Sequence, residues 1–188
     1  MPPLTGKLQG SGTMRSQPGH KPESDAKEVP MRLTGPERYN LAFKEGSFTV
    51  WKENGEKGFA GIAASRGPKL YIIFNDLERP IYVGVTLQTL NSRLKQGFMA
   101  KGEHGYYGYA WRRNSNHVII DVWKHEDPMP DNPIYDIETV EAEVVFLVRQ
   151  AYQWPEHQTE IHFHPSYLEH RSAAARIADC YDGFQRPA

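Results

Sequence analysis

The sequence KLYIIFNDLERPIYVGVTLQTLNSRLKQ, at residues 69–96, decides the expected fold. β-branched and aromatic residues fill 70–74 and 81–85, and the turn-forming residues between these two runs predict a β-hairpin. Thr86 then predicts a helix N-cap, and leucines at helical spacing predict a helix that ends at Gly97. Two tyrosines, a glycine and an arginine in this unit are not required by its hydrophobic pattern.

The remaining segments extend this unit to an expected α+β domain. Residues 117–123 predict a third strand, and an apolar stripe over 137–153 predicts a core-facing helix. We expect an α/β protein of this α+β type, with a small three-stranded antiparallel sheet flanked by helices. A short strand signal at 47–51, a possible strand at 158–164 and a closing helix at 170–180 complete the pattern. Residues 1–35 are rich in Pro, Gly and Ser and predict a flexible tail, and 36–188 predict a single domain with its core at 67–165.

The charges are unevenly distributed although the formal net charge is only −1. Residues 66–113 contain eight Lys or Arg against three Asp or Glu, whereas 121–143 contain one lysine against eight carboxylates. This pattern fits either a basic patch for a polyanion or two solvated faces. The single cysteine, Cys180, excludes an intrachain disulfide and a thiolate-rich zinc site. We expect a soluble, cytoplasmic protein, because the sequence has neither an apolar signal segment nor a membrane-spanning run.

A glycine-rich stretch from 97 to 108 includes tyrosines and precedes Trp111, Arg112 and Arg113. Two interpretations remain open for it. Its aromatic rings pack on the sheet, or they stack on nucleic-acid bases while the arginines hold phosphates.

Glu141 lies in the middle of the apolar stripe of the predicted 137–153 helix. A carboxylate at such a position is costly unless it is paired, protonated or bound to a metal. If 158–164 is a strand, Gln158, Glu160, His162 and His164 share one face, either lining a site or facing solvent.

These residue types are those that metal-assisted phosphodiester cleavage needs. Such a reaction requires a carboxylate for the metal, a base for water and a cation for the phosphate. Glu141 offers an oxygen ligand to Mg²⁺ or Mn²⁺, and Arg93 offers a planar donor fork. Tyr71 and Tyr82 lie on paired strands, and their hydroxyl groups converge if the register allows it.

The order of these residues resembles the GIY-YIG nuclease superfamily. Lys69-Leu70-Tyr71 corresponds to the first family motif and Tyr82-Val83-Gly84 to the second. Thr86 and Arg93-Leu94 correspond to a typical threonine and arginine, and Glu141 to the family's metal-binding glutamate. Lys69 stands where the family has a glycine, and Gly97 where many members have a histidine.

The resemblance implies a role for each matched residue. Tyr71 would activate water, Tyr82 would assist it or bind the phosphate, Arg93 would stabilise the transition state, and Glu141 would hold the metal. It implies a divalent-metal-dependent endonuclease of a restriction, mobile-element or defence type, with DNA rather than RNA as its expected partner. Further expected nucleic-acid contacts are Lys69, Lys95, Lys101, His104, Arg112 and Arg113, and possible additional site residues are Gly84, Gln158, Glu160 and His162.

Two other functions remain open. One is a nuclease-fold module that binds nucleic acid or a protein partner without cutting. The other is a transition-metal site built from His157, His162, His164 and His170. The sequence predicts neither an oligomeric state nor a target sequence.

Overall fold

The computed structural model describes residues 30–44, 47–102 and 108–184. These ranges contain strands β1 (Leu33–Lys44), β2 (Ser47–Lys52), β3 (Lys69–Phe74), β4 (Pro80–Thr86) and β5 (His117–His125). They also contain helices α1 (Gly61–Ala64), α2 (Leu90–Met99), α3 (Tyr135–Gln150) and α4 (Leu168–Ala178), with 3₁₀ turns η2 (Ala110–Arg113) and η3 (Asp182–Phe184). The hairpin, the 117–123 strand and the long amphipathic helix predicted from the sequence are therefore confirmed.

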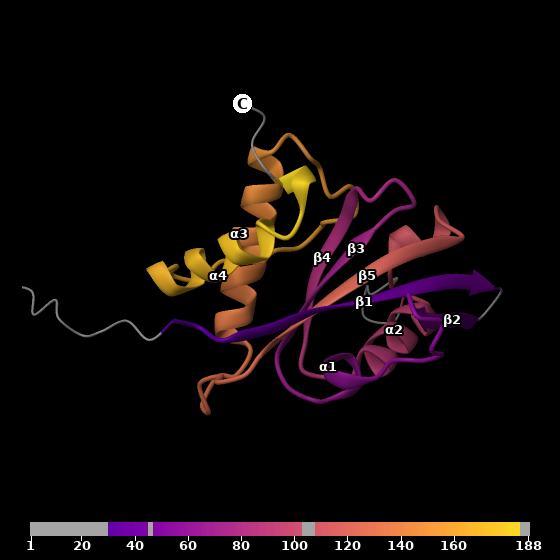
Figure 1. Ribbon diagram of the computed structural model, residues 1–188, viewed down its shortest axis with the longest axis horizontal. Coiled ribbons are helices and arrows are strands. Elements are labelled where there is room, and N and C mark those ends of the chain that lie inside the picture. The colour runs from indigo at the N-terminus through magenta and orange to yellow at the C-terminus, as the bar shows by residue number, and fades with distance from the viewer. Residues whose placement is uncertain (1–29, 45–46, 103–107, 185–188) are drawn as a thin grey trace, which may run out of the picture.

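The predicted three-stranded sheet is wrong, because the described chain forms a five-stranded sheet in the order β2-β1-β5-β3-β4. All neighbouring strands are antiparallel. The expected three strands are β3, β4 and β5, and β1 and β2 extend the sheet beyond β5. The fold is an α+β arrangement with β4 at the edge that carries the candidate site (Figure 1).

Strand β1 has a weak sequence signal because it contains several polar residues. Tertiary contacts satisfy such residues in the folded chain. Its register against β5 shifts between Thr34 and Glu37. The Arg38 guanidinium donates two hydrogen bonds of 2.8 Å to the carboxylate of Asp121, which is fully buried in β5. The strand begins at Leu33, inside the stretch expected to be a tail, whereas residues 1–29 of that stretch lie outside the described residues.

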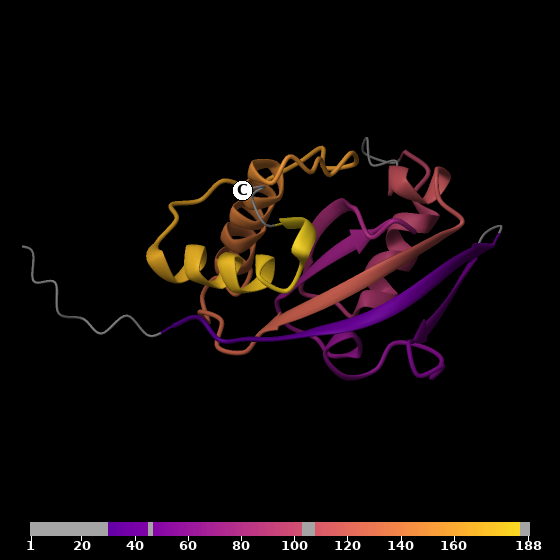
Figure 2. The same ribbon diagram turned by 45° about the horizontal axis from the view of Figure 1, so that its top comes forward.

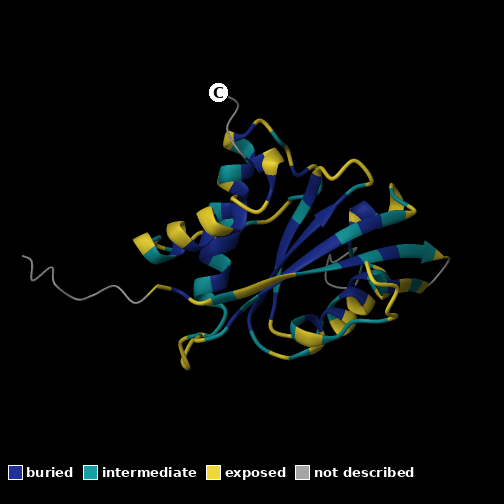
Figure 3. Ribbon diagram, in the orientation of Figure 1, coloured by how far each residue is buried: buried dark blue, intermediate teal, exposed yellow. Residues whose placement is uncertain are grey.

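The sheet separates two layers of helices, as Figures 1 and 2 show. Successive β3 residues point to opposite faces, so Leu70, Ile72 and Phe74 pack with α3 and α4. Tyr71 and Ile73 pack with the buried residues of α1, α2 and η2 on the other face. Figure 3 shows the central strands buried between the two layers, which explains why every residue of β3 is buried.

Two local predictions need correction. The α2 N-cap is Thr89 rather than Thr86: the Thr89 hydroxyl accepts a hydrogen bond from the Ser92 N–H, and Gly97 lies inside the helix. Residues 158–164 form no strand. The Gln158 side chain accepts a hydrogen bond from the Val83 N–H of edge strand β4, at 2.9 Å, in place of a backbone partner.

None of the helices in the described ranges is long and apolar enough to cross a membrane.

Candidate active site at the β4 edge of the sheet

Tyr71 and Tyr82 lie on the same face of the β3–β4 hairpin. Tyr71 is directly opposite Gly84, and Tyr82 is two residues from Gly84, so the register places both phenols together. Their ring centroids are 6.0 Å apart. A Cβ atom on Gly84 would lie 2.7 Å from the Tyr71 hydroxyl and 2.6 Å from the Tyr82 ring. Glycine at this position therefore provides the space that the two tyrosines occupy.

Arg93 and Glu141 approach these tyrosines from opposite layers. Arg93 is on α2, whose Leu90 and Leu94 are buried on the Tyr71 face, whereas Glu141 is on α3, on the other face. The two meet near β4 because it is the edge strand. Arg93 interacts electrostatically with Tyr71, Tyr82 and Glu141. The structure thus brings together the four residues that the sequence singled out.

Glu141 is a buried carboxyl group, only 4% exposed. Burial raises its pKa to about 8, with Glu138 and Glu160 adding to the shift and Gln158 and Arg93 opposing it. Glu141 Oε1 accepts a hydrogen bond from Gln158 Nε2, and this bond is long at 3.5 Å. A desolvated carboxylate with so little compensation suits a divalent cation, and Mg²⁺ commonly takes one or two protein carboxylates plus water. The donor set therefore fits a single-carboxylate Mg²⁺ or Mn²⁺ site.

The phenols in this site are held in their neutral form. Burial raises the pKa of Tyr71, although the charge of Arg93 acts against the shift. Burial likewise raises the pKa values of Tyr82 and Tyr109. At neutral pH these hydroxyl groups are therefore hydrogen-bond donors, and a base role for Tyr71 requires an additional nearby cation.

Tyr109 is a site residue that the sequence reasoning did not select. Its hydroxyl lies 3.1 Å from the Tyr71 hydroxyl, and the Arg93 guanidinium lies 5.8 Å from its ring centroid. The ring of Tyr109 also stacks on Trp111, with centroids 5.0 Å apart. The glycine and aromatic pattern of 97–111 was the available signal, but only the fold shows that this tyrosine reaches Tyr71.

Gly97 is explained by the position of Tyr109. A Cβ atom at residue 97 would lie 2.1 Å from Tyr109 Cε2, so no larger side chain fits while the ring stays in place. Many members of the resembled family have a histidine at the position of Gly97. In this chain the glycine leaves space there for the ring of Tyr109, which comes from another segment.

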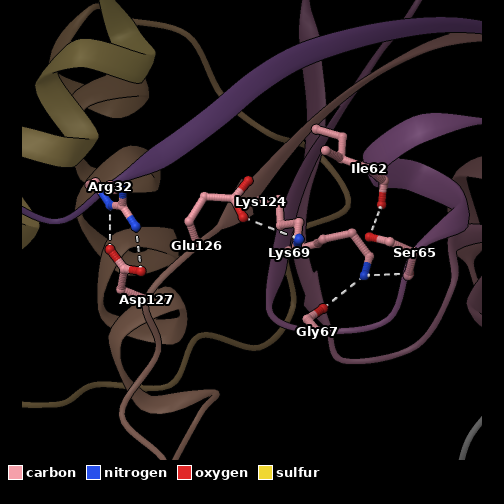
Figure 4. Close-up of polar contacts among 8 residues, drawn as sticks. All are labelled: Arg32, Ile62, Ser65, Gly67, Lys69, Lys124, Glu126 and Asp127. Atoms are coloured by element: carbon pink, nitrogen blue, oxygen red, sulfur yellow. Dashed lines mark hydrogen bonds and ion pairs between the residues drawn. The ribbon is translucent and has the colours of Figure 1, made fainter.

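The expected nucleic-acid contacts have different surroundings. Lys69 is fully buried, and its ammonium donates hydrogen bonds to the carbonyls of Ser65 at 2.9 Å and Gly67 at 2.7 Å (Figure 4). Burial and the charge of Lys124 lower the pKa of Lys69 to about 8. Lys69 is thus a structural residue that fixes the loop before β3, and the expectation of a surface contact is corrected.

The other expected contacts lie on α2, after it, or in η2. Lys95, Lys101 and Arg113 are exposed, Arg112 is half-buried, and His104 lies outside the described residues.

The segment after α3 supplies one neighbour of Glu141 and several surface groups. Gln158 spans from β4 to Glu141, whereas the Glu160 side chain is exposed. His162 lies 3.8 Å from Glu138, within ion-pair distance, and His164 lies 2.8 Å from the same carboxylate. Of the expected polar face, Gln158 is therefore the residue in direct contact with Glu141.

The four histidines of the possible transition-metal site do not share one set of contacts. His170 contacts Asp136 at 3.3 Å and caps α4, while the backbone of His157 bonds to Ile81. Among the residues that the structure describes, no group of three or more His, Cys, Asp or Glu could hold a metal ion. The geometry gives no support to a transition-metal site of that kind.

Comparisons of the chain with protein-family models, with curated proteins and with solved structures found no match.

Proposed function

We propose that the protein is a divalent-metal-dependent endonuclease that hydrolyses phosphodiester bonds in DNA. The observation that supports this proposal most is the convergence of Arg93, Tyr71 and Tyr82 with the buried carboxyl of Glu141 at one edge of the sheet. Their order in the sequence resembles that of GIY-YIG nucleases, and the tertiary proximity is a property independent of that order.

Each residue has a role that its surroundings suit. Arg93 binds the phosphate and offsets the negative charge that develops in the transition state. Glu141 is the ligand for Mg²⁺ or Mn²⁺, which when bound supplies Lewis acidity and lowers the pKa of coordinated water. Because Tyr82 is neutral and only partly buried, it donates a hydrogen bond to a phosphate oxygen.

With a metal ion held by Glu141 as the additional cation, Tyr71 would ionise to its phenolate, and the phenolate would take the proton from the attacking water. The positive charge of Arg93 favours its phenolate, and the hydroxyl of Tyr109 stabilises that anion by a hydrogen bond. Tyr109 thereby orients Tyr71 without touching the substrate.

A plasmid-nicking assay tests this proposal. Supercoiled DNA is incubated with the protein in Mg²⁺ or in EDTA, alongside Glu141→Gln and a matched control, Glu143→Gln, two residues away on the same helix. We expect nicking in Mg²⁺ only, loss of nicking in the Glu141 variant and retention in the control. Absence of metal-dependent nicking by folded protein on DNA and RNA substrates contradicts the proposal.

The second candidate is a nuclease-fold module that binds nucleic acid or a protein partner without cutting it. The complete burial of Tyr71 favours this candidate, because a base must reach the water from which it takes a proton. DNA binding by the unmodified protein, together with no cleavage in the nicking assay, would support the binding module.

A further inference from the structure

A basic surface pocket of about 300 Å³ lies beside the aromatic rings of Phe98, Tyr109 and Trp111, which contact one another next to the candidate active site. It is formed where β1 ends, where β2 begins, near the end of α2 and at η2. None of Tyr71, Tyr82, Arg93 and Glu141 lines it. The described residues that line it are Phe43, Lys44, Ser47, Phe98, Arg112 and Arg113.

The lining has the chemistry of a phosphate site. Of the six lining residues that the structure describes, three are cations, one carries a hydroxyl, and none is a carboxylate. Lys44 and Arg113 are exposed, so their charged groups are accessible to a ligand. Multiple N–H donors and a hydroxyl around one concave site match the several acceptor oxygens of a phosphodiester.

Arg112 is held in place before any ligand binds. Its Nη1 donates a hydrogen bond to the Phe98 carbonyl, and its guanidinium lies 5.7 Å from the Phe98 ring centroid. A guanidinium has five N–H donors and this bond uses one group, so others remain for an anion. A side chain that is already ordered loses less conformational entropy on binding than a free one.

The pocket is close to Arg93 along α2. Phe98 follows Arg93 by five residues on that helix, which corresponds to about 7.5 Å along its axis. The Tyr109 ring lies between them, 6.1 Å from the Phe98 ring and 5.8 Å from the Arg93 guanidinium. The pocket and Arg93 are therefore close enough to contact the same DNA strand.

We propose that this pocket binds a backbone phosphate of the DNA strand on which Arg93 acts. The inference rests on the proposed function for the identity of its ligand, and it concerns affinity rather than cleavage. The pocket adds a fixed phosphate contact that positions the strand across Arg93.

The test compares two double variants by fluorescence anisotropy with a labelled DNA duplex. Lys44→Ala/Arg113→Ala removes two charges from the pocket, and Arg79→Ala/Arg171→Ala removes two from exposed positions outside it. All four side chains are exposed, and Arg112 is left unchanged because it contacts Phe98. Binding is measured in EDTA over a series of salt concentrations, so that no strand is cut.

We expect the pocket variant to bind about tenfold more weakly than the unmodified protein at low salt. For the pocket variant, the slope of log affinity against log salt concentration is expected to fall in magnitude by about one, as for the loss of one phosphate contact. The affinity and the slope of the control variant are expected to stay near those of the unmodified protein. An unchanged slope and affinity, an equal loss in the control, or no DNA binding at all would overturn the inference. If the unmodified protein binds DNA but never cuts it, the endonuclease proposal fails while this comparison still decides the pocket.

Discussion

Replacing Glu141 by Gln is expected to change how stability depends on pH. In the folded protein, burial raises the pKa of Glu141 to about 8 from an ordinary value of 4.5. Between these values the unfolded chain has lost the proton that the folded chain retains, so the stability of the unmodified protein falls as pH rises. Above about pH 8 both states are ionised and no further loss occurs. Gln does not titrate, so the variant lacks this dependence.

The size of the effect follows from the same pKa values. A pH of 7 is about 2.5 units above the ordinary pKa of the carboxyl in the unfolded chain. Over this interval the loss of folding stability corresponds to about 3 kcal/mol. The difference in unfolding free energy between the variant and the unmodified protein is therefore expected to move by about 3 kcal/mol, in favour of the variant, from pH 4 to pH 7.

Urea unfolding at a series of pH values measures this difference, with Glu143→Gln as the control. Two parallel curves for the unmodified protein and the Glu141 variant would refute the reasoning, because they would mean that Glu141 is not desolvated. Added Mg²⁺ near pH 8 is expected to stabilise the unmodified protein by about 3 kcal/mol at a concentration of 100 Kd, and the Glu141 variant not at all. Equal stabilisation of both proteins would place the metal elsewhere.

Three other substitutions test the surroundings of the site. Gly97→Ala is expected to lower the unfolding free energy by about 2 kcal/mol, because the new methyl group overlaps the Tyr109 ring; urea unfolding checks this, and unchanged stability would show that the ring moves freely. Tyr109→Phe removes the hydroxyl 3.1 Å from that of Tyr71, and we expect about 1 kcal/mol less stability and a shift of the pH–rate profile of nicking to higher pH; an unshifted profile would assign Tyr109 a packing role only. Burial lowers the pKa of Lys69 to about 8, so the unmodified protein is expected to gain stability as pH rises from about 8 towards 10.5, because the buried ammonium loses its charge. Lys69→Met is expected to lack that gain. Equal pH dependence of the two proteins in thermal unfolding would argue against a charged, buried Lys69.

The candidate site could be predicted only in part from local sequence. Glu141 was identifiable because a carboxylate on the apolar stripe of a helix conflicts with burial, and this conflict persists in any fold that buries the helix. Tyr109 was not identifiable in the same way, since the tyrosines of a glycine-rich segment are locally equivalent. Lys69 was expected to contact nucleic acid, but the carbonyls of the preceding loop accept hydrogen bonds from its ammonium group and allow it to be buried.

The apolar spacing of the chain was enough to predict the hairpin of β3 and β4, strand β5 and helix α3, because alternating or helical spacing is a local property. Local spacing could not predict that β1 joins the sheet. The contact that satisfies the polar side chain of Arg38 is with Asp121, 83 positions away along the chain. Nor could local spacing predict that Arg93 and Glu141 meet, since they lie on helices on opposite faces of the sheet. Only the tertiary structure, by placing β4 at the edge with Gly84 opposite Tyr71, brings those two side chains to one site.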